Sequence, residues 1–172
     1  MSNTISINKK NKIKILDQRQ LPFKEKYIIT DNYKVVIAAI KNLSVRGAPA
    51  IGVAGAFASF LALNELKDKQ NFILEIRRRL KQIERSRPTA VNLSWAIKRF
   101  NYILSGQNKT LDYLKKKFLQ EALTIEKEEK NISNKISKFG KNLIKNNYKI
   151  LTHCNTGTLA TTGPGTAFGI IS

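Results

Sequence analysis

Residues 45–53 read VRGAPAIGV and open the longest apolar run of the chain, which extends from Ala48 to Leu63. Pro49 suits the first turn of a helix, because the N–H groups of that turn have no intrahelical partner. The run is rich in alanine and in glycines such as Gly52, which let neighbouring helices approach closely. It is shorter than the ~20 residues that span a bilayer. We therefore expect a buried helix over about 50–66, and no membrane partner.

Apolar residues recur every three to four positions in four further segments, and this spacing predicts four more helices, which would pack against the buried helix. The expected helices cover residues 32–42, 70–85, 90–104 and 110–146. Asp31 is the expected N-cap of the first of these helices, because its carboxylate can accept from free backbone N–H groups. The longest helix is expected to carry one apolar face and to break near Gly140.

β-Branched residues mark the remaining segments. Residues 12–16 and 26–30 flank a turn and predict a small hairpin or two short edge strands. Residues 149–153 form a short apolar run before a glycine-rich segment, which predicts a strand that leads into a helix. The expected fold is an α-rich α+β domain over 1–147, with a small β-sheet plus a helix bundle. The first strand and helix start of a truncated Rossmann-like α/β domain are expected over 148–172.

The chain is strongly basic, with 31 Lys and Arg residues against 12 acidic ones, a net charge of +19 and a pI near 10.2. Such a balance can indicate nucleic-acid binding when the charge gathers on one face. Here the basic residues are spread along the chain, and lysine, asparagine and isoleucine are abundant together, which suggests compositional drift. The cluster Arg77–Arg79 lies in a helical pattern and fits a solvated face. We expect no specific nucleic-acid partner, and a basic RNA-binding module stays an alternative.

The chain has one cysteine, Cys154, which excludes an intrachain disulfide. The segment Met1–Lys14 is polar and basic and lacks the apolar core of a secretory signal. We therefore expect a cytoplasmic protein.

Arg46 and Arg87 are candidate phosphate ligands. Each stands in a loop just before an expected helix start, close to a proline and among small or apolar residues. A guanidinium beside the free N–H groups of a helix N-terminus makes a phosphate site. The alternative is ordinary surface charge, as expected for most lysines and arginines of the chain.

Cys154 would lie at the carboxyl end of the expected strand, where ligands bind in open α/β sheets. A helix N-terminus lowers the pKa of a nearby thiol, which would suit a chemical role. The alternative is a buried structural cysteine, which is the more common case from position alone. Adjacent strand residues point to opposite faces, so His153 and Cys154 should not form a Cys–His dyad. A lone histidine at a strand end is more often structural, so His153 is expected to be a hydrogen-bonded core residue. Residues 163–169 read GPGTAFG, one position away from the dinucleotide-binding pattern. They could hold a phosphate or merely permit close helix packing.

Four segments resemble the methylthioribose-1-phosphate isomerases in order and spacing. They are residues 15–18 with Leu21-Pro22, residues 45–53, residues 86–93, and residues 151–157 followed by 159–161 and 165–167. The similarity covers nearly the whole chain. The superfamily also includes ribose-1,5-bisphosphate isomerase and the regulatory subunits of initiation factor 2B. Pro164 departs from many relatives, which bears on the local geometry of the glycine loop.

The resemblance implies an aldose–ketose isomerase of methionine salvage, which converts 5-methylthioribose 1-phosphate to 5-methylthioribulose 1-phosphate without metal or nucleotide cofactor. By motif match, Arg46, Gly47 and Ala48 contact the substrate, Arg87 holds its phosphate, and Cys154 is the catalytic cysteine. Family members are much longer and carry the partner aspartate in their second half.

We therefore expect this chain to be the N-terminal half, inactive alone, of a protein that forms a homodimer at full length. Two alternatives stay open: another sugar-phosphate isomerase, such as the ribose-1,5-bisphosphate enzyme, and a non-catalytic regulatory subunit like the initiation-factor relatives.

Overall fold

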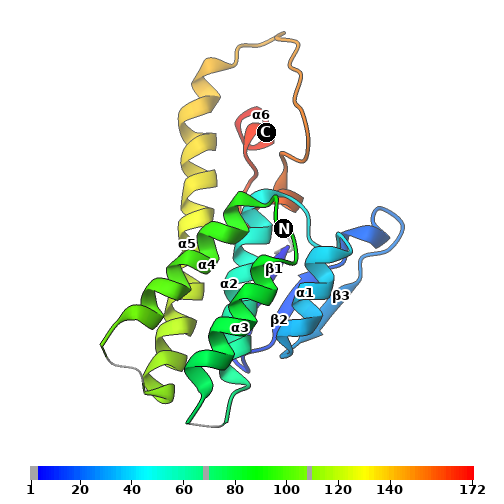
Figure 1. The fold of residues 1–172 in the computed structure, drawn as a ribbon. Coiled ribbons are helices and arrows are strands. Elements are labelled where there is room, and N and C mark those ends of the chain that lie inside the picture. Colours follow the sequence, from blue (N-terminus) through cyan, green and yellow to red (C-terminus); the bar gives the residue numbers. More distant parts are fainter. Residues whose placement is uncertain (1–3, 68–69, 108–109) are drawn as a thin grey trace.

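The computed structural model describes residues 4–67, 70–107 and 110–172; the first three residues of the N-terminal segment analysed above lie outside these ranges. Helices pack around one central helix, with a small sheet at one side (Figure 1). The strands are β1 (Ile5–Ile7), β2 (Ile13–Leu16) and β3 (Tyr27–Thr30). The α-helices are α1 (Tyr33–Lys41), α2 (Ala48–Asn64), α3 (Phe72–Glu84), α4 (Val91–Ser105), α5 (Leu111–Gly140) and α6 (Ala167–Ile171).

The central helix is α2, which is buried on all sides from Ala50 to Leu63. A helix that is apolar all round must be surrounded, because no face of it suits water. Helices α1, α3, α4 and α5 all contact it. Its glycines set how closely α4 approaches, since a Cβ at Gly52 would lie 3.1 Å from Asn92 Cβ and one at Gly55 would overlap Leu93. The prediction of a buried helix with close packing is confirmed.

The surrounding helices show one apolar face each. In α3 the buried residues recur at helical spacing, from Phe72 to Ile83. Helices α4 and α5 meet through the rings of Phe100 and Phe118, whose centroids are 4.8 Å apart. The expected apolar face of α5 is buried from Leu111 to Ile125 only; beyond it Ile132 and Phe139 are exposed.

The sheet is antiparallel in the order β1-β2-β3. Ile13 and Ile15 of β2 are fully buried, whereas Lys14 between them lies on the other face, as the alternation of a strand requires. The predicted hairpin is confirmed, and β1 adds a strand that the sequence pattern did not reveal. The predicted N-cap of α1 is wrong: Asn32 caps the helix, and Asp31 pairs instead with Lys12 at 3.6 Å.

The last segment of the chain folds back on the bundle. Helix α5 ends at Gly140, where a break was expected, and not at Asn146 as predicted. The chain then reverses and runs beside the upper half of α5 toward α6 (Figure 1). Residues 149–153 form no strand in the described structure, which corrects the prediction; a strand needs a hydrogen-bonded neighbour, and none lies beside this segment. His153 is exposed and is therefore not the core residue we expected.

Among the described helices, none combines the length and the apolar character needed to cross a membrane.

Candidate functional site

The first turns of α2 and α4 lie side by side at one end of the bundle. Pro49 of α2 and Val91 and Asn92 of α4 line the same groove, which has a volume of about 450 Å³. Neither helix has a side-chain cap at its N-terminus, where Gly47 and Ala90 stand, and neither has an acidic residue in its first turn. Two uncapped N-termini together present free N–H groups and two partial positive charges, an arrangement that favours an anion.

Arg46 and Arg87 stand in the loops that lead into these two helices. Arg46 Nε and Arg87 Nη1 are buried and have no hydrogen-bond partner among the described residues. The Arg46 guanidinium makes one long contact, from Nη2 to the Gln18 carbonyl oxygen at 3.5 Å. Buried polar groups of proteins are nearly always paired, so two unpaired guanidinium N–H groups in neighbouring loops suit an anionic ligand.

Gly47 allows the Arg46 loop to touch the C-terminal segment. Its φ of +89° lies in the region that side chains other than glycine's rarely adopt. A Cβ at this position would lie 2.5 Å from Ala160 Cα and 2.6 Å from Ala160 O. Ala48, the next predicted contact, is exposed at the first position of α2. The N-terminal motif and the C-terminal segment are therefore in direct backbone contact.

Cys154 lies in the exposed, irregular part of that segment and has a φ of +68°. Two residues on, the Thr156 carbonyl accepts from the Thr166 N–H at 2.8 Å, and Thr166 lines the groove between α2 and α4. Within the described residues no hydrogen bond joins the thiol to Arg46 or Arg87. The expected convergence of the thiol and the two arginines on one cleft stays a prediction.

The wall of the groove opposite the helix N-termini is mostly apolar. It is formed by Ile125, Ile132 and Ile136 of α5, with Glu128 and Glu129 beside them. Both carboxylates are engaged: Glu128 pairs with Arg99, and Glu129 accepts from the backbone N–H of Thr162 at 2.7 Å and from its hydroxyl.

Burial raises the pKa of the nearby Glu126 carboxyl group; the charge of Lys130 opposes this shift, and the negative charge of Glu129 adds to it.

The glycines of residues 163–169 serve close packing. A Cβ at Gly163 would overlap the Ser133 hydroxyl, and one at Gly169 would overlap the Ser137 hydroxyl, both on α5. Gly165 has a φ of +109° and lies against the Thr156 carbonyl. This favours the packing interpretation over a phosphate loop.

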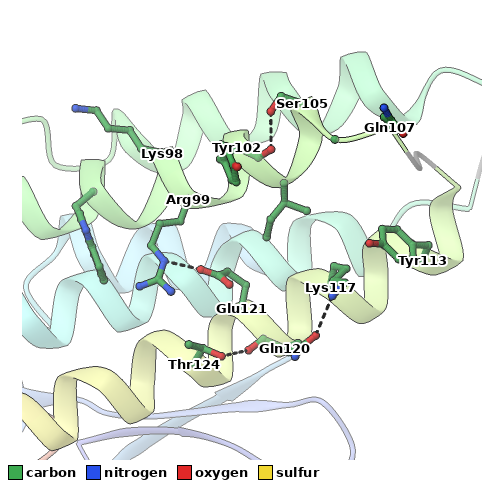
Figure 2. A pocket seen from close by; sticks show the side chains of 13 residues that line it. Lys98, Arg99, Tyr102, Ser105, Gln107, Tyr113, Lys117, Gln120, Glu121 and Thr124 are labelled. Carbon is green, nitrogen blue, oxygen red and sulfur yellow. Dashed lines mark hydrogen bonds and ion pairs between the residues drawn. The ribbon is translucent and has the colours of Figure 1, made fainter.

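A larger groove, of about 850 Å³, lies between α4 and α5 (Figure 2), and none of the predicted site residues is among the lining residues of either groove. Arg99 occupies it and is paired with Glu121 and Glu128, while its guanidinium lies 4.8 Å from the ring centroid of Trp95. Lys117 contacts Gln120 at 3.5 Å. Lys98 also lines this groove, whereas no lysine or arginine is among the residues that line the smaller one.

Sequence patterns did not identify Gln18 and Glu129 as site residues; both hold the C-terminal segment in place through hydrogen bonds. The Gln18 amide donates to the Leu159 carbonyl at 2.7 Å. Gln18 belongs to a quoted motif, but nothing in the pattern indicated its distant partner. In the described ranges, no three His, Cys, Asp or Glu side chains gather as a metal ion would require.

Comparison with known proteins links this site to a family. Residues 44–171 match the Initiation factor 2 subunit family. The methylthioribose-1-phosphate isomerase of Caldicellulosiruptor saccharolyticus is 42% identical over 162 residues, which cover 94% of this chain and 47% of that protein. The isomerase of the same name from Acetivibrio thermocellus is 44% identical over 162 residues, with 92% and 47% covered. The chain thus spans about half the length of the curated relatives it matches.

Two solved structures share the fold. The crystal structure of 5-methylthioribose 1-phosphate isomerase from Pyrococcus horikoshii OT3 superposes with a TM-score of 0.90 at 32% identity, covering 99% of this chain and 48% of that one. Subunit delta of translation initiation factor eIF-2B from A. fulgidus gives a TM-score of 0.86 at 33% identity, covering 99% and 50%. The small sheet and the helices match the N-terminal part of these folds.

Proposed function

Since the chain belongs to the Initiation factor 2 subunit family, we propose that it supplies the phosphate-binding part of an isomerase that converts 5-methylthioribose 1-phosphate to 5-methylthioribulose 1-phosphate. The observation that carries this proposal is the pair of buried, unpartnered guanidinium N–H groups of Arg46 and Arg87 beside two uncapped helix N-termini. A phosphate dianion would satisfy both features at once.

The chemistry requires firm positioning. In the proposed substrate the C1 oxygen carries the phosphate, so the ring cannot open as a free sugar does. The ring must open with acid help, and a hydrogen must then move between C2 and C1. Arg46 and Arg87 hold the phosphate so that these carbons stay in place. Cys154 and a carboxyl group beyond residue 172 would handle the protons.

The groove favours this substrate over a sugar bisphosphate. Its α5 wall consists of Ile125, Ile132 and Ile136, and two carboxylates, Glu128 and Glu129, lie beside them. An apolar thioether at C5 suits such a wall, because it loses little hydration there. A second phosphate at C5 would lose hydration and would be repelled by the carboxylates.

Three further features belong to the proposal. Residues 148–172 open a Rossmann-like domain. The intact protein works as a homodimer in the cytoplasm. Residues 1–172 span about half the length of the isomerases that they match, and alone they do not turn over the substrate.

The test is a substrate panel on the intact protein with matched arginine variants. Arg46→Met and Arg87→Met each remove a charge-assisted contact and should lower kcat/KM for 5-methylthioribose 1-phosphate by about 10- to 100-fold. Arg85→Met, which removes an exposed arginine two residues from Arg87, is the control and should change it less than about 2-fold. Cys154→Ala should abolish turnover.

Three results would contradict the proposal. Preference for ribose 1,5-bisphosphate would favour the related isomerase. Full function after Cys154→Ala would favour a regulatory subunit. Turnover by residues 1–172 alone would remove the need for a missing group.

A further inference from the structure

Gln18 is a buried polar residue that joins three segments. Only 2% of its surface is exposed, and it stands in the short turn Gln18–Gln20 that directly follows β2. A buried amide needs partners, because an unpaired one is costly. The backbone N–H of Gln18 donates to the Ser44 carbonyl at 3.1 Å, which anchors the residue beside the loop that leads into α2.

The two ends of Gln18 face different parts of the candidate site. Its carbonyl oxygen accepts from Arg46 Nη2 at 3.5 Å. Its side-chain Nε2 donates to the Leu159 carbonyl at 2.7 Å, five residues beyond Cys154. The next residue, Ala160, is the one that Gly47 touches. One residue therefore contacts both the arginine and the segment that carries the thiol.

We propose that Gln18 is a positioning residue, which fixes the Arg46 guanidinium relative to the Cys154 segment. This deepens the proposed function and rests on it. The Gln18 carbonyl engages one guanidinium nitrogen and leaves Nε free for a phosphate oxygen, while its amide holds the thiol segment at a set distance. Without the amide contact, phosphate still binds to the arginines and the helix N-termini. The segment that carries Cys154 is then no longer held at a fixed position relative to the bound phosphate. Reaction geometry depends on such relative placement far more than binding does.

Thr4 offers a matched comparison. Its hydroxyl donates to the Thr158 carbonyl at 2.8 Å, one residue before the partner of Gln18, and Thr4 is equally buried at 2%. Within the described residues no hydrogen bond links Thr4 to the Arg46 loop. Thr4→Val and Gln18→Met therefore each remove one donor to the same segment at similar volume. Gln18→Met keeps the backbone carbonyl that Arg46 contacts, so it releases the Leu159 segment from a residue that still contacts Arg46, which Thr4→Val does not do.

The first measurement is steady-state kinetics of the intact protein with 5-methylthioribose 1-phosphate. Gln18→Met should lower kcat by about 10-fold or more while KM and inhibition by inorganic phosphate stay within about 3-fold. Thr4→Val should leave kcat within about 3-fold of wild type, although both variants should lower the unfolding midpoint similarly. Equal kcat losses in the two variants would mean that Gln18 is only structural and would overturn the proposal. If Gln18→Met does not fold, Gln18→Asn keeps the amide but is too short by one methylene to reach Leu159.

The second measurement does not depend on turnover. Cys154 is alkylated with iodoacetamide with and without inorganic phosphate, and the modified peptide is quantified by mass spectrometry. Phosphate should change the alkylation rate in wild type and Thr4→Val but not in Gln18→Met. A phosphate effect of the same size in all three proteins, or none in wild type, would refute the positioning role. No isomerase turnover together with this pattern would instead reject the proposed function and leave the role of Gln18 standing.

Discussion

Replacing Gly47 by alanine tests how the N-terminal motif and the C-terminal segment fit together. The backbone of Gly47 has a φ of +89° and a ψ of 130°, and an alanine there is strained by roughly 1–3 kcal/mol. The new Cβ would also lie 2.5 Å from Ala160 Cα, so the segment must move away by roughly 1 Å to reach ordinary contact. That movement weakens the hydrogen bonds from Thr4 and Gln18 to the Thr158 and Leu159 carbonyls, each contributing about 0.5–1.5 kcal/mol.

Gly47→Ala should therefore lower the free energy of unfolding by roughly 2–6 kcal/mol, measured by urea denaturation of the intact protein. Hydrogen exchange should rise in residues 156–163 beyond the global change, because these residues lose their contact first. Gly106→Ala is the control, since Gly106 has a φ of −63° and its nearest atom, Ile103 O, is 3.3 Å away. A Gly47→Ala protein as stable as Gly106→Ala, with unchanged exchange, would refute the contact between the two segments.

Three other substitutions test the core and the sheet. Gly55→Ala should destabilise by about 1–3 kcal/mol in urea denaturation, because its Cβ would overlap Leu93 in a tightly packed interface; a stability within 0.5 kcal/mol of wild type would show looser packing. Ser59→Ala, one turn along the same buried helix, should stay within about 0.5 kcal/mol of wild type, because its hydroxyl only shares the helical carbonyl of Gly55. Asp17→Asn should cost about 1 kcal/mol at pH 7, since Arg19 lowers the pKa of Asp17 to about 2 but is itself half-exposed. The depressed pKa means that this stabilisation is present above about pH 4 and fades toward pH 2, so the wild-type and variant unfolding curves should converge in acid; a constant gap would contradict it.

Sequence patterns predicted the helices because their signal is local. The apolar run after Pro49 and the periodic apolar residues of α3 and α5 fix a helical face without reference to other segments. Strands depend on distant partners, and the strand predictions were wrong in two ways. One observed strand was not predicted, and one predicted strand does not form. β1 is only three residues long and gains its stability from β2, so its own sequence carries little signal. Residues 149–153 have strand-like composition but lie beside no strand, so they stay unpaired.

The residues of the candidate site also differ in whether the sequence alone could identify them. Arg46 and Arg87 could be singled out because prolines and small residues next to a helix start are visible in the sequence. Gln18 could not be, because its partner Leu159 lies 141 residues away and is recognised through its backbone carbonyl. Any residue offers a carbonyl, so no side-chain pattern marks such a contact.

Several unfavourable features of the fold lie at one end of the bundle. Arg46 and Arg87 bury donors without partners, at a cost of about 1–3 kcal/mol each, and two helices begin there without caps. Gly47 and Cys154 add backbone with positive φ in the segments that meet there. Elsewhere the same protein pairs its arginines, as Arg99 with two glutamates, so the sequence is capable of satisfying buried guanidinium groups. Buried donors that the protein itself leaves unpaired are typical of a site shaped for a ligand rather than for stability. A dianion that bonds both arginines and both helix ends would turn each of these costs into a contact.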